Sequence, residues 1–243
     1  MFDDFEERNR EFIARQSGDE ELSRLTRAWF AASSKHEYAY HFKWLGRPII
    51  QFPQDIVALQ EIIWKVRPNL IIETGIARGG SLIFSASILE LLSGDGRVVG
   101  VDIDIREHNR VEIEQHPLYP RIRMIQGSSV DPEIFRQVER EAETRDRVLV
   151  ILDSNHTHEH VARELQLYAP LVTKGSYLIV FDTIIEDMPS DFSAGRPWGK
   201  DDNPKTAVRE FLKSTDRFII DEEYNRKLLI TVAPEGYLRC VKD

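Results

Sequence analysis

Acidic side chains stand where apolar runs end along the middle of the chain. Four of five such runs end in an acid or are followed directly by one, and these acids are Glu73, Asp102, Asp153 and Asp182. Apolar runs without polar alternation are typical of strands that are buried on both faces of a parallel sheet. Because ligands of such sheets bind outside the carboxyl ends of the strands, the sequence predicts one polar binding site built from these acids.

A glycine-rich turn follows the first of these acids. Gly75 comes soon after Glu73, and Gly79 and Ser81 open the next helical pattern. Glycine permits a tight turn and a close backbone approach to a ligand, and a helix start offers free amide donors. The dinucleotide fingerprint needs glycine where Glu73 stands, whereas a carboxylate suits a cationic, hydroxyl-rich ligand. We therefore expect S-adenosylmethionine as the cofactor, with an ordinary strand-to-helix turn as the alternative for this segment alone.

The next two strand ends carry groups that suit a nucleoside. Asp102 is placed where a carboxylate accepts hydrogen bonds from both ribose hydroxyls in nucleotide-binding sheets. Gly127 and Ser128 follow the third run, where the adenine edge of such a ligand lies. The alternatives are a solvated acid at Asp102 and ordinary loop composition at Gly127 and Ser128.

Asp153 and Asp182 form the predicted metal site. They follow strands expected to be neighbours, whose ends lie roughly 5 Å apart. Two carboxylates that close repel each other unless a cation or a proton lies between them. A divalent ion is the simplest answer, and oxygen ligands completed by water suit Mg²⁺, with Mn²⁺ or Ca²⁺ able to substitute. One shared proton, or two acids splayed into solvent, is the alternative.

His156 is the predicted general base. It lies three residues after Asp153, in a loop that opens the next helix. A neutral imidazole there takes a proton from a substrate hydroxyl, with Asp153 beside it in the catalytic centre. His158 and His160 follow closely, but a helix points His158 away from the other two. For His158 and His160 we expect surface positions on that helix rather than a transition-metal cluster.

The elements that must position these residues alternate between strand and helix. The expected strands are residues 70–73, 98–102, 122–126, 148–152 and 176–181. The expected helices are 53–66, 81–92, 109–115, 132–142, 159–168 and 205–213. The pattern predicts an α/β, Rossmann-like, doubly wound and mostly parallel sheet. Residues 218–221 and 228–232 are expected to close it as an antiparallel edge hairpin.

The N-terminal part differs in composition from the rest. Residues 1–52 are expected to form a helical and aromatic cap or oligomerisation arm, and residues 53–243 the S-adenosylmethionine-binding domain. The aromatic stretch 38–52, together with Trp198, provides either a wall for an acceptor molecule or core packing.

Charge and cysteine content narrow the class of partner. The net charge of −9 argues against nucleic acid or an anionic membrane as the main partner. The single cysteine excludes an intrachain disulfide, the acidic start has no signal-peptide pattern, and no apolar run is long enough for a membrane span. We therefore expect a cytoplasmic protein that binds a small molecule.

Several short motifs together carry a resemblance to a known family. They are Trp64-x-x-Arg67-Pro68, Ile72-Glu73-Thr74-Gly75, Gly79-Gly80-Ser81-Leu82, Gly100-Val101-Asp102, Asp153-Ser154-Asn155-His156 and the stretch 175–182. Over about residues 44–230 the chain resembles the cephalosporin hydroxylase family, which includes rhamnosyl O-methyltransferases. More broadly it is similar to the Mg²⁺-dependent catechol O-methyltransferase group. The resemblance implies the fold and cofactor pocket of class I S-adenosylmethionine methyltransferases.

By position, the resemblance assigns the same roles that the residues suggest. Glu73 and Gly75 match the methionine side of the cofactor pocket, and Asp102 matches its ribose acid. Asp153 and Asp182 match the metal ligands, and His156 the general base. One departure concerns the residue beside the last acid, where the family carries a second polar ligand.

Phe181 or Thr183 occupies that slot in this chain. The metal therefore has fewer protein ligands and more water, or Glu186 and Asp187 fold back to help, or the site no longer holds metal tightly.

The expected reaction is transfer of a methyl group from S-adenosylmethionine to a hydroxyl of a small molecule, such as a sugar, polyol or natural product. A divalent metal assists by chelating the acceptor. Two alternatives remain: a non-catalytic S-adenosylmethionine-binding subunit, and a metal-dependent hydroxylase, as the family name suggests. The resemblance also implies a homo-oligomer, with residues 1–35 in the contact.

Overall fold

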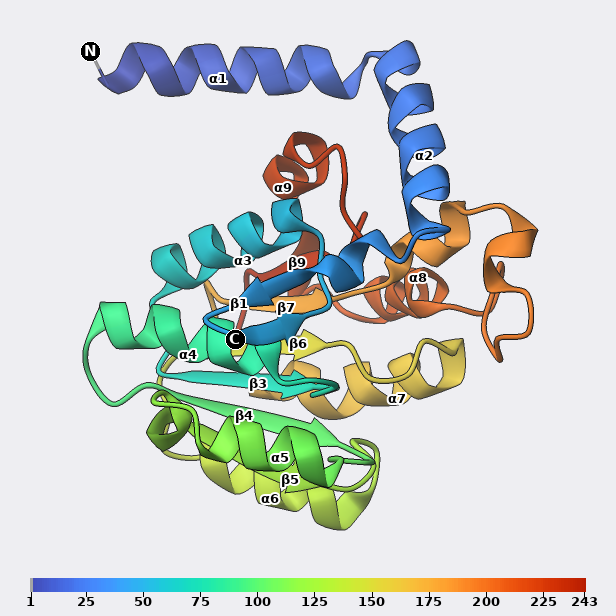
Figure 1. Ribbon diagram of the computed structural model, residues 1–243. Coiled ribbons are helices and arrows are strands. Elements are labelled where there is room, and N and C mark those ends of the chain that lie inside the picture. The colour runs from blue at the N-terminus through green and yellow to red at the C-terminus, as the bar shows by residue number, and fades with distance from the viewer. Residues whose placement is uncertain (1) are drawn as a thin grey trace.

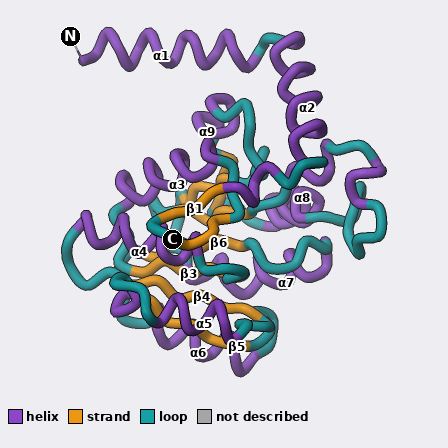
Figure 2. Tube along the Cα trace, in the orientation of Figure 1, coloured by secondary structure: helices purple, strands orange, loops and turns teal. Residues whose placement is uncertain are grey.

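A central seven-stranded sheet with helices on both faces forms the body of the protein (Figure 1, Figure 2). The structure, a computed structural model, describes residues 2–243. Its strands are β1 Phe42–Trp44, β2 Arg47–Ile49, β3 Leu70–Thr74, β4 Arg97–Asp102, β5 Ile122–Gln126, β6 Val148–Leu152, β7 Tyr177–Val180, β8 Phe218–Ile220 and β9 Tyr237–Cys240. Its helices are α1 Phe2–Ser17, α2 Glu20–Ser34, α3 Pro53–Val66, α4 Gly80–Leu92, α5 Glu107–Glu114, α6 Pro132–Ala142, α7 His158–Tyr168, α8 Pro204–Ser214 and α9 Glu222–Lys227.

The strand order is β5-β4-β3-β6-β7-β9-β8. Strands β3 to β7 are parallel, and β9 is antiparallel to both of its neighbours, β7 and β8. The predicted Rossmann-like, doubly wound sheet with an antiparallel C-terminal edge is confirmed. The order also makes β6 and β7 neighbours, as the expected pairing of Asp153 with Asp182 requires.

Two hydrophobic cores lie on opposite faces of the sheet. Ile71 of β3 belongs to a cluster with side chains of α3, α4 and α5, whereas Leu70 and Ile72 belong to a cluster with side chains of α6, α7 and α8. Successive strand residues point to opposite faces. Every residue of β3 and β6 is buried, whichever face of the sheet it points to. This is why apolar residues follow one another along these strands without polar alternation.

The closing edge of the sheet corrects one prediction. Strand β8 lies where residues 218–221 were expected to form a strand, but the expected second strand at 228–232 is wrong. Strand β9 takes that place, and α9 begins at the helix cap Asp221. The apolar stretch 228–232 is drawn away from the sheet because the Val232 amide donates a hydrogen bond to buried Asp55, at 2.9 Å.

The N-terminal helices stand apart from the sheet. Helix α1 extends away from the body and meets α2 at an angle (Figure 1). Near its end, Gln16 Nε2 donates to the carbonyl oxygens of Arg226 and Lys227 in α9, at 3.0 and 3.1 Å. The division of the chain at residue 52 stays a prediction.

The strand pair β1–β2 lies against the start of α4. A Cβ atom added to Gly80 would lie 2.1 Å from the carbonyl oxygen of Pro48. Only a glycine allows this approach, which places the end of the aromatic stretch beside the strand ends.

Candidate functional site

The predicted site residues lie at one edge of the sheet, where the parallel strands end. Strand register sets Thr74 beside Leu152, and Leu152 beside Val180, so the three chains leave the sheet at the same level. Gly75 then adopts φ +92°, and a Cβ atom there would lie 2.0 Å from the carbonyl oxygen of Asp153. Gly75 is therefore required for β3 to end so close to β6.

Asp153, His156 and Asp182 come together above this junction. One possible ligand atom from each lies within 4.8 Å of the others. The Nε2 atom of His156 is 3.3 Å from Oδ2 of Asp182. Asp182 has a left-handed backbone, with φ 56°, a conformation that is uncommon outside glycine and that is often found at functional sites.

The electrostatics of this group suit a cation. Burial raises the pKa of Asp153 well above its ordinary value, and the nearby charges of Asp182 and Glu73 raise it further. A carboxyl in this position is stabilised in its charged form by a bound cation. Two carboxylates and an imidazole form a donor set that fits a divalent ion completed by water.

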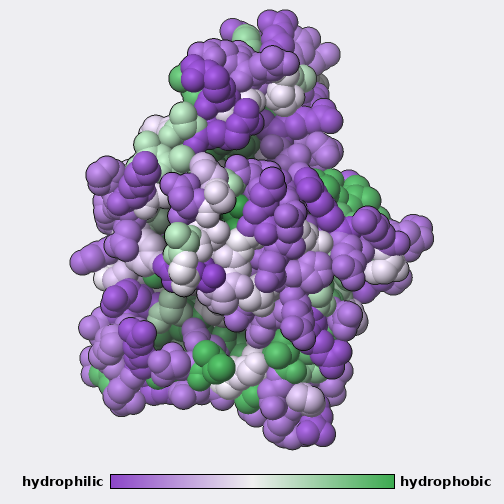
Figure 3. Space-filling view, turned by 90° about the vertical axis from the view of Figure 1, so that its right-hand side faces the viewer, coloured by the Kyte–Doolittle hydropathy of each residue, from purple (hydrophilic) through white to green (hydrophobic). Residues whose placement is uncertain are grey.

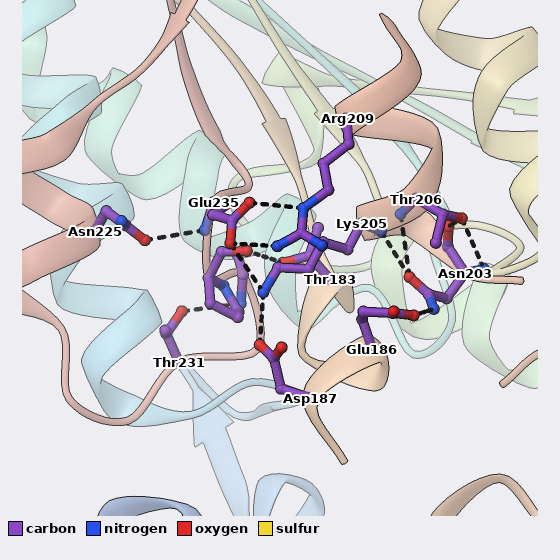
Figure 4. A network of polar contacts seen from close by, with 12 residues as sticks. Thr183, Glu186, Asp187, Asn203, Lys205, Thr206, Arg209, Asn225, Thr231 and Glu235 are labelled. Atoms are coloured by element: carbon purple, nitrogen blue, oxygen red, sulfur yellow. Dashed lines mark hydrogen bonds and ion pairs between the residues drawn. The ribbon is translucent and has the colours of Figure 1, made fainter. Parts of the chain in front are cut away.

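Glu186 and Asp187 are directed elsewhere. Oε2 of Glu186 accepts hydrogen bonds from the amide of Asp201, at 2.9 Å, and from Nδ2 of Asn203, at 2.5 Å. Oδ2 of Asp187 lies 2.6 Å from Nζ of the buried Lys205 (Figure 4). Both acids therefore fasten the segment after β7 to the start of α8. The group of possible metal ligands among residues 2–243 includes neither of them.

Phe181 lies directly before Asp182, at one of the two positions open to a second polar ligand. Its side chain is buried, and it lines a small cavity beneath Asp153. Thr183 is also buried, and its hydroxyl donates to the carbonyl oxygen of Pro234, at 2.7 Å. Neither neighbour of Asp182 therefore offers a free oxygen to the group.

Glu73 is a buried acid with one free oxygen. The Ser81 hydroxyl, in the first turn of α4, donates to Oε1 of Glu73. The other oxygen, Oε2, is buried and has no hydrogen-bond partner among the described residues. Burial raises the pKa of Glu73 to about 7, and the bond from Ser81 only partly offsets this. An unpartnered buried carboxylate oxygen fits a cationic donor such as an ammonium group.

Gln51 is a residue of the site that the sequence does not predict. It lies at the end of the aromatic stretch, and its Nε2 donates to Oδ2 of Asp153 at 3.3 Å. With Asp55, Glu73 and Asp153 it lines a cavity of about 10 Å³ open to a water-sized sphere. No local pattern marks this residue, because its partner is distant in the sequence.

Asp102 shapes the glycine turn from the next strand. Its Oδ2 accepts hydrogen bonds from the amides of Ile76, at 2.8 Å, and Ala77, at 3.1 Å, and its Oδ1 accepts from Asp104, at 2.9 Å. Carboxylate oxygens accept more than one hydrogen bond, so these contacts leave capacity for ligand hydroxyls. Gly79 caps α4 with φ +80°, where an added Cβ would meet Ile113 at 2.3 Å.

Gly127 and Ser128 follow β5 beside Asp102. The amide of Gly127 donates to the carbonyl oxygen of Asp102, at 2.8 Å, and the carbonyl of Ser128 accepts from Asp131, at 3.0 Å. Gly127 has φ +154°, and an added Cβ would lie 2.4 Å from Ile134. The structure thus brings every predicted site residue to the same sheet edge. One group contains the possible metal ligands and Glu73, and the other contains Asp102, Gly127 and Ser128. The hydrogen bonds from the turn after β3 to Asp102 connect the two groups.

The other two histidines lie outside the metal group. His158 contacts Oγ1 of Thr206 at 2.8 Å, and His160 contacts Oγ of Ser129 at 3.1 Å. Both side chains are half-buried rather than fully exposed, because α8 and the loop after β5 cover that helix face.

The edge of the sheet opens onto a mixed surface. Figure 3 looks onto the side toward which β3 and β4 point in Figure 1, and shows a mostly hydrophilic face with small hydrophobic patches. The Trp198 ring meets the ring of His156 edge-on, with centroids 5.6 Å apart, and the Arg196 guanidinium lies over Trp198 at 5.7 Å. An aromatic side chain therefore flanks the predicted base on this face.

Sequence comparison matches the chain to characterised proteins. The family model described as Rhamnosyl O-methyltransferase/CmcI matches residues 36–241. A rhamnosyl O-methyltransferase of Mycobacterium bovis is 30% identical over 188 residues, covering 76% of this chain and 72% of that protein. A rhamnosyl O-methyltransferase of Mycobacterium leprae is 31% identical over 202 residues, covering 80% of this chain and 81% of that protein.

Structure comparison supports the same fold. A solved structure of CmcI with Mg-SAM aligns with a TM-score of 0.58 at 21% identity, covering 84% of this chain and 78% of that one. The alignment shows that the two proteins share the Rossmann-like architecture.

Proposed function

The chain belongs to the family described as Rhamnosyl O-methyltransferase/CmcI, and from this membership we propose that it is an S-adenosylmethionine-dependent O-methyltransferase assisted by a divalent metal. One observation of the site carries the proposal. Asp153, His156 and Asp182 converge within 4.8 Å, next to the unpartnered oxygen of buried Glu73. A cation site and an ammonium site thus lie side by side at the strand ends.

The cofactor pocket spans β3, β4 and β5. Glu73 accepts the ammonium group on the methionine side, and Asp102 accepts the ribose hydroxyls. Gly75 and Gly79 allow the turn after β3 its course beside the ligand, because a side chain at either position would collide with the protein itself. The proposed cofactor-binding residues are Glu73, Gly75, Gly79, Ser81, Asp102, Gly127, Ser128 and Asp153.

Asp153 and Asp182 are the proposed metal ligands. Mg²⁺ suits these oxygen donors, and Mn²⁺ or Ca²⁺ fits the same set. When bound, such an ion supplies Lewis acidity that lowers the pKa of an acceptor hydroxyl. Glu186 and Asp187 hold the following loop, so water and acceptor oxygens would have to supply the remaining ligands.

His156 is the proposed general base, working beside the metal ligand Asp153. Its Nε2 takes the proton of the acceptor hydroxyl while the methyl group passes to that oxygen and S-adenosylhomocysteine is left. The Asp182 carboxylate 3.3 Å away stabilises the imidazolium that results. The remaining contribution of the protein is to hold donor and acceptor in line.

The acceptor class is a small molecule with a hydroxyl, namely a sugar, polyol or natural product. The curated relatives are named for a rhamnosyl group, which favours a sugar hydroxyl. Trp198 flanks His156 and provides an apolar ring against which the face of a sugar packs.

We further propose a cytoplasmic homo-oligomer in which residues 1–35 form the contact, and no nucleic-acid or membrane partner. Helices α1 and α2 expose large apolar side chains, with Phe5 68%, Phe12 51% and Leu25 49% accessible. No helix within residues 2–243 is both long and apolar enough to cross a membrane. Deletion of residues 1–35 is expected to yield a monomer, as measured by light scattering. An unchanged number of subunits would refute the proposed contact through residues 1–35.

Calorimetric titration of S-adenosylmethionine, with and without Mg²⁺, tests the function. We expect binding by the wild type, weaker binding by Asp102→Ala, and loss of the Mg²⁺ effect in Asp153→Ala. A panel of sugars and polyols then gives the acceptor. Absence of binding in the wild type would overturn the proposal, and binding without turnover of any acceptor would indicate a non-catalytic subunit.

A further inference from the structure

Two residues with unpartnered acceptor atoms line the same cavity. Oε1 of Gln51 and Oε2 of Glu73 are both buried without a hydrogen-bond partner among residues 2–243. Both residues line the small cavity beneath Asp153. Buried polar atoms are normally hydrogen-bonded, so two unsatisfied acceptors on residues that line one cavity indicate a missing donor.

The orientation of the Gln51 amide follows from its neighbour. Its Nε2 lies 3.3 Å from Oδ2 of Asp153, where an amide donor is attracted and a carbonyl oxygen is repelled. The carbonyl end must therefore be the free end. Gln51 is only 7% exposed, so water does not readily satisfy it from outside.

The cavity has an excess of negative charge. Asp55, Glu73 and Asp153 line it, and none of its lining residues within the described part of the chain is Lys, Arg or His. Asp55 already accepts from Thr231, Val232 and Tyr237, so it adds charge without offering an unused oxygen. The missing donor is therefore expected to be a cation with several hydrogens.

The size of the cavity limits what enters it. About 10 Å³ open to a water-sized sphere is room for one water or one ammonium group, and not for a whole ligand. The cavity thus takes the end group of a ligand whose other parts lie above the strand ends.

We propose that Gln51 is a cofactor-binding residue whose Oε1 shares the α-ammonium group of S-adenosylmethionine with Oε2 of Glu73. This inference rests on the proposed function. It gives the segment before α3 a direct part in the cofactor pocket, a role that the sequence does not predict for it. It also links the cofactor to the metal group, because the same amide donates to Asp153.

Two nucleoside ligands test the contact. S-adenosylhomocysteine carries the ammonium group, whereas 5′-methylthioadenosine lacks the amino-acid part. Both are titrated calorimetrically in EDTA, so that any effect of Gln51 on a metal does not enter. For Gln51→Met we expect the affinity for S-adenosylhomocysteine to fall about 10-fold or more, as for a lost hydrogen bond to a charged group. The affinity for 5′-methylthioadenosine should stay the same, which also shows that the variant is folded.

Gln54→Met is the matched control. Gln54 lies in the first turn of α3 and also has a buried, unpartnered Oε1, but it does not line the cavity. We expect it to bind both ligands like the wild type. Unchanged binding of S-adenosylhomocysteine by Gln51→Met, or equal weakening of both ligands, would overturn the inference and leave the proposed function standing. If the wild type binds neither ligand, the proposed function itself fails.

Discussion

Nε2 of His156 lies 3.3 Å from Oδ2 of Asp182, so the proposed base contacts one of the proposed metal ligands. Without a cation, the carboxylate of Asp182 is available to the imidazole. A cation held by Asp153 and Asp182 would draw on the same carboxylate. The geometry therefore predicts that metal binding and the His156–Asp182 contact are coupled.

The His156→Ala variant distinguishes a role of His156 as general base from a role as metal ligand. We expect kcat to fall about 10²- to 10⁴-fold, as for loss of a general base, while the affinity for Mg²⁺ changes only a few-fold. Steady-state rates over a Mg²⁺ titration measure both quantities.

His158→Ala serves as the control for that experiment, because His158 contacts Thr206 and Glu210 outside the metal group. A large loss of Mg²⁺ affinity in His156→Ala alone would make His156 a third ligand rather than the base.

Asp153→Asn is expected to change stability in opposite directions with and without metal. Burial and the charges of Asp182 and Glu73 raise the pKa of Asp153, so its carboxyl is in an unfavourable environment in the metal-free protein. A neutral amide tolerates this environment better. In EDTA we expect Asp153→Asn to melt at the same temperature as the wild type or at a higher one. Adding Mg²⁺ should raise the melting temperature of the wild type but not that of the variant.

Asp104→Asn is the matched control, since Asp104 is an exposed acid two residues past the end of β4. It should keep the full Mg²⁺-induced rise in melting temperature. A rise that persists in Asp153→Asn would show that the metal binds elsewhere.

The strand ends could be predicted because their signal is local. A strand buried on both faces must be apolar throughout, so the first polar residue marks the edge of the sheet, as at Glu73, Asp102 and Asp153. The carboxyl ends of parallel strands lie at one edge of the sheet, so these residues are brought together, and the pairing of β6 with β7 places Asp153 beside Asp182.

Contacts between distant segments could not be predicted in this way. The sequence predicts Asp55 only as part of the helix 53–66, yet its carboxylate accepts hydrogen bonds from Val232 and Tyr237 across the core. Gln51 meets Asp153 only because the β1–β2 pair lies on Gly80. Neither residue lies in a periodic or motif-like pattern, so tertiary packing alone reveals it.

Lys205 is expected to hold the loop that carries Trp198. Its Nζ lies 2.6 Å from Asp187 and 3.2 Å from Glu235, and the side chain is 3% exposed (Figure 4). Lys205→Met leaves both acids without this partner. We expect the free energy of unfolding in urea to fall by about 2 kcal/mol. This is less than the ~3–5 kcal/mol typical of breaking a fully buried pair, because Glu235 still has Arg209 as an ion-pair partner.

Binding data distinguish a loop effect from general damage. Affinity for S-adenosylhomocysteine should be unchanged in Lys205→Met, because the network lies beyond the cofactor strands, while the KM for the acceptor rises. Lys213→Met, at an exposed position of the same helix, should match the wild type in its affinity for S-adenosylhomocysteine and in its KM for the acceptor. A Lys205→Met variant as stable as the wild type would contradict a structural role for the network.

Asp55→Asn tests a buried acid by its pH dependence. Burial raises the pKa of Asp55 to about 6, and the bonds from Thr231, Val232 and Tyr237 only partly offset this. The folded state therefore binds this proton more tightly than the unfolded state. The contribution of Asp55 to stability is greatest below its ordinary pKa and is lost as the pH rises to about 6.

The free energy of unfolding of the wild type, relative to Asp55→Asn, should accordingly fall by about 2 kcal/mol between pH 4 and 7. Urea unfolding of both proteins across this range measures it. A difference that is independent of pH would mean that Asp55 is not the group that titrates.

Glu73 makes cofactor binding depend on pH. Burial raises its pKa to about 7 in the free protein, so below this pH the carboxyl is largely protonated. An ammonium ligand binds the ionised form, and a proton must leave before it binds. The affinity for S-adenosylhomocysteine in EDTA should therefore rise between pH 6 and pH 8, while that for 5′-methylthioadenosine stays level. Glu73→Gln should bind S-adenosylhomocysteine about 10-fold or more weakly at pH 8 and lose this slope, whereas a slope that survives in the variant would assign the proton to another group.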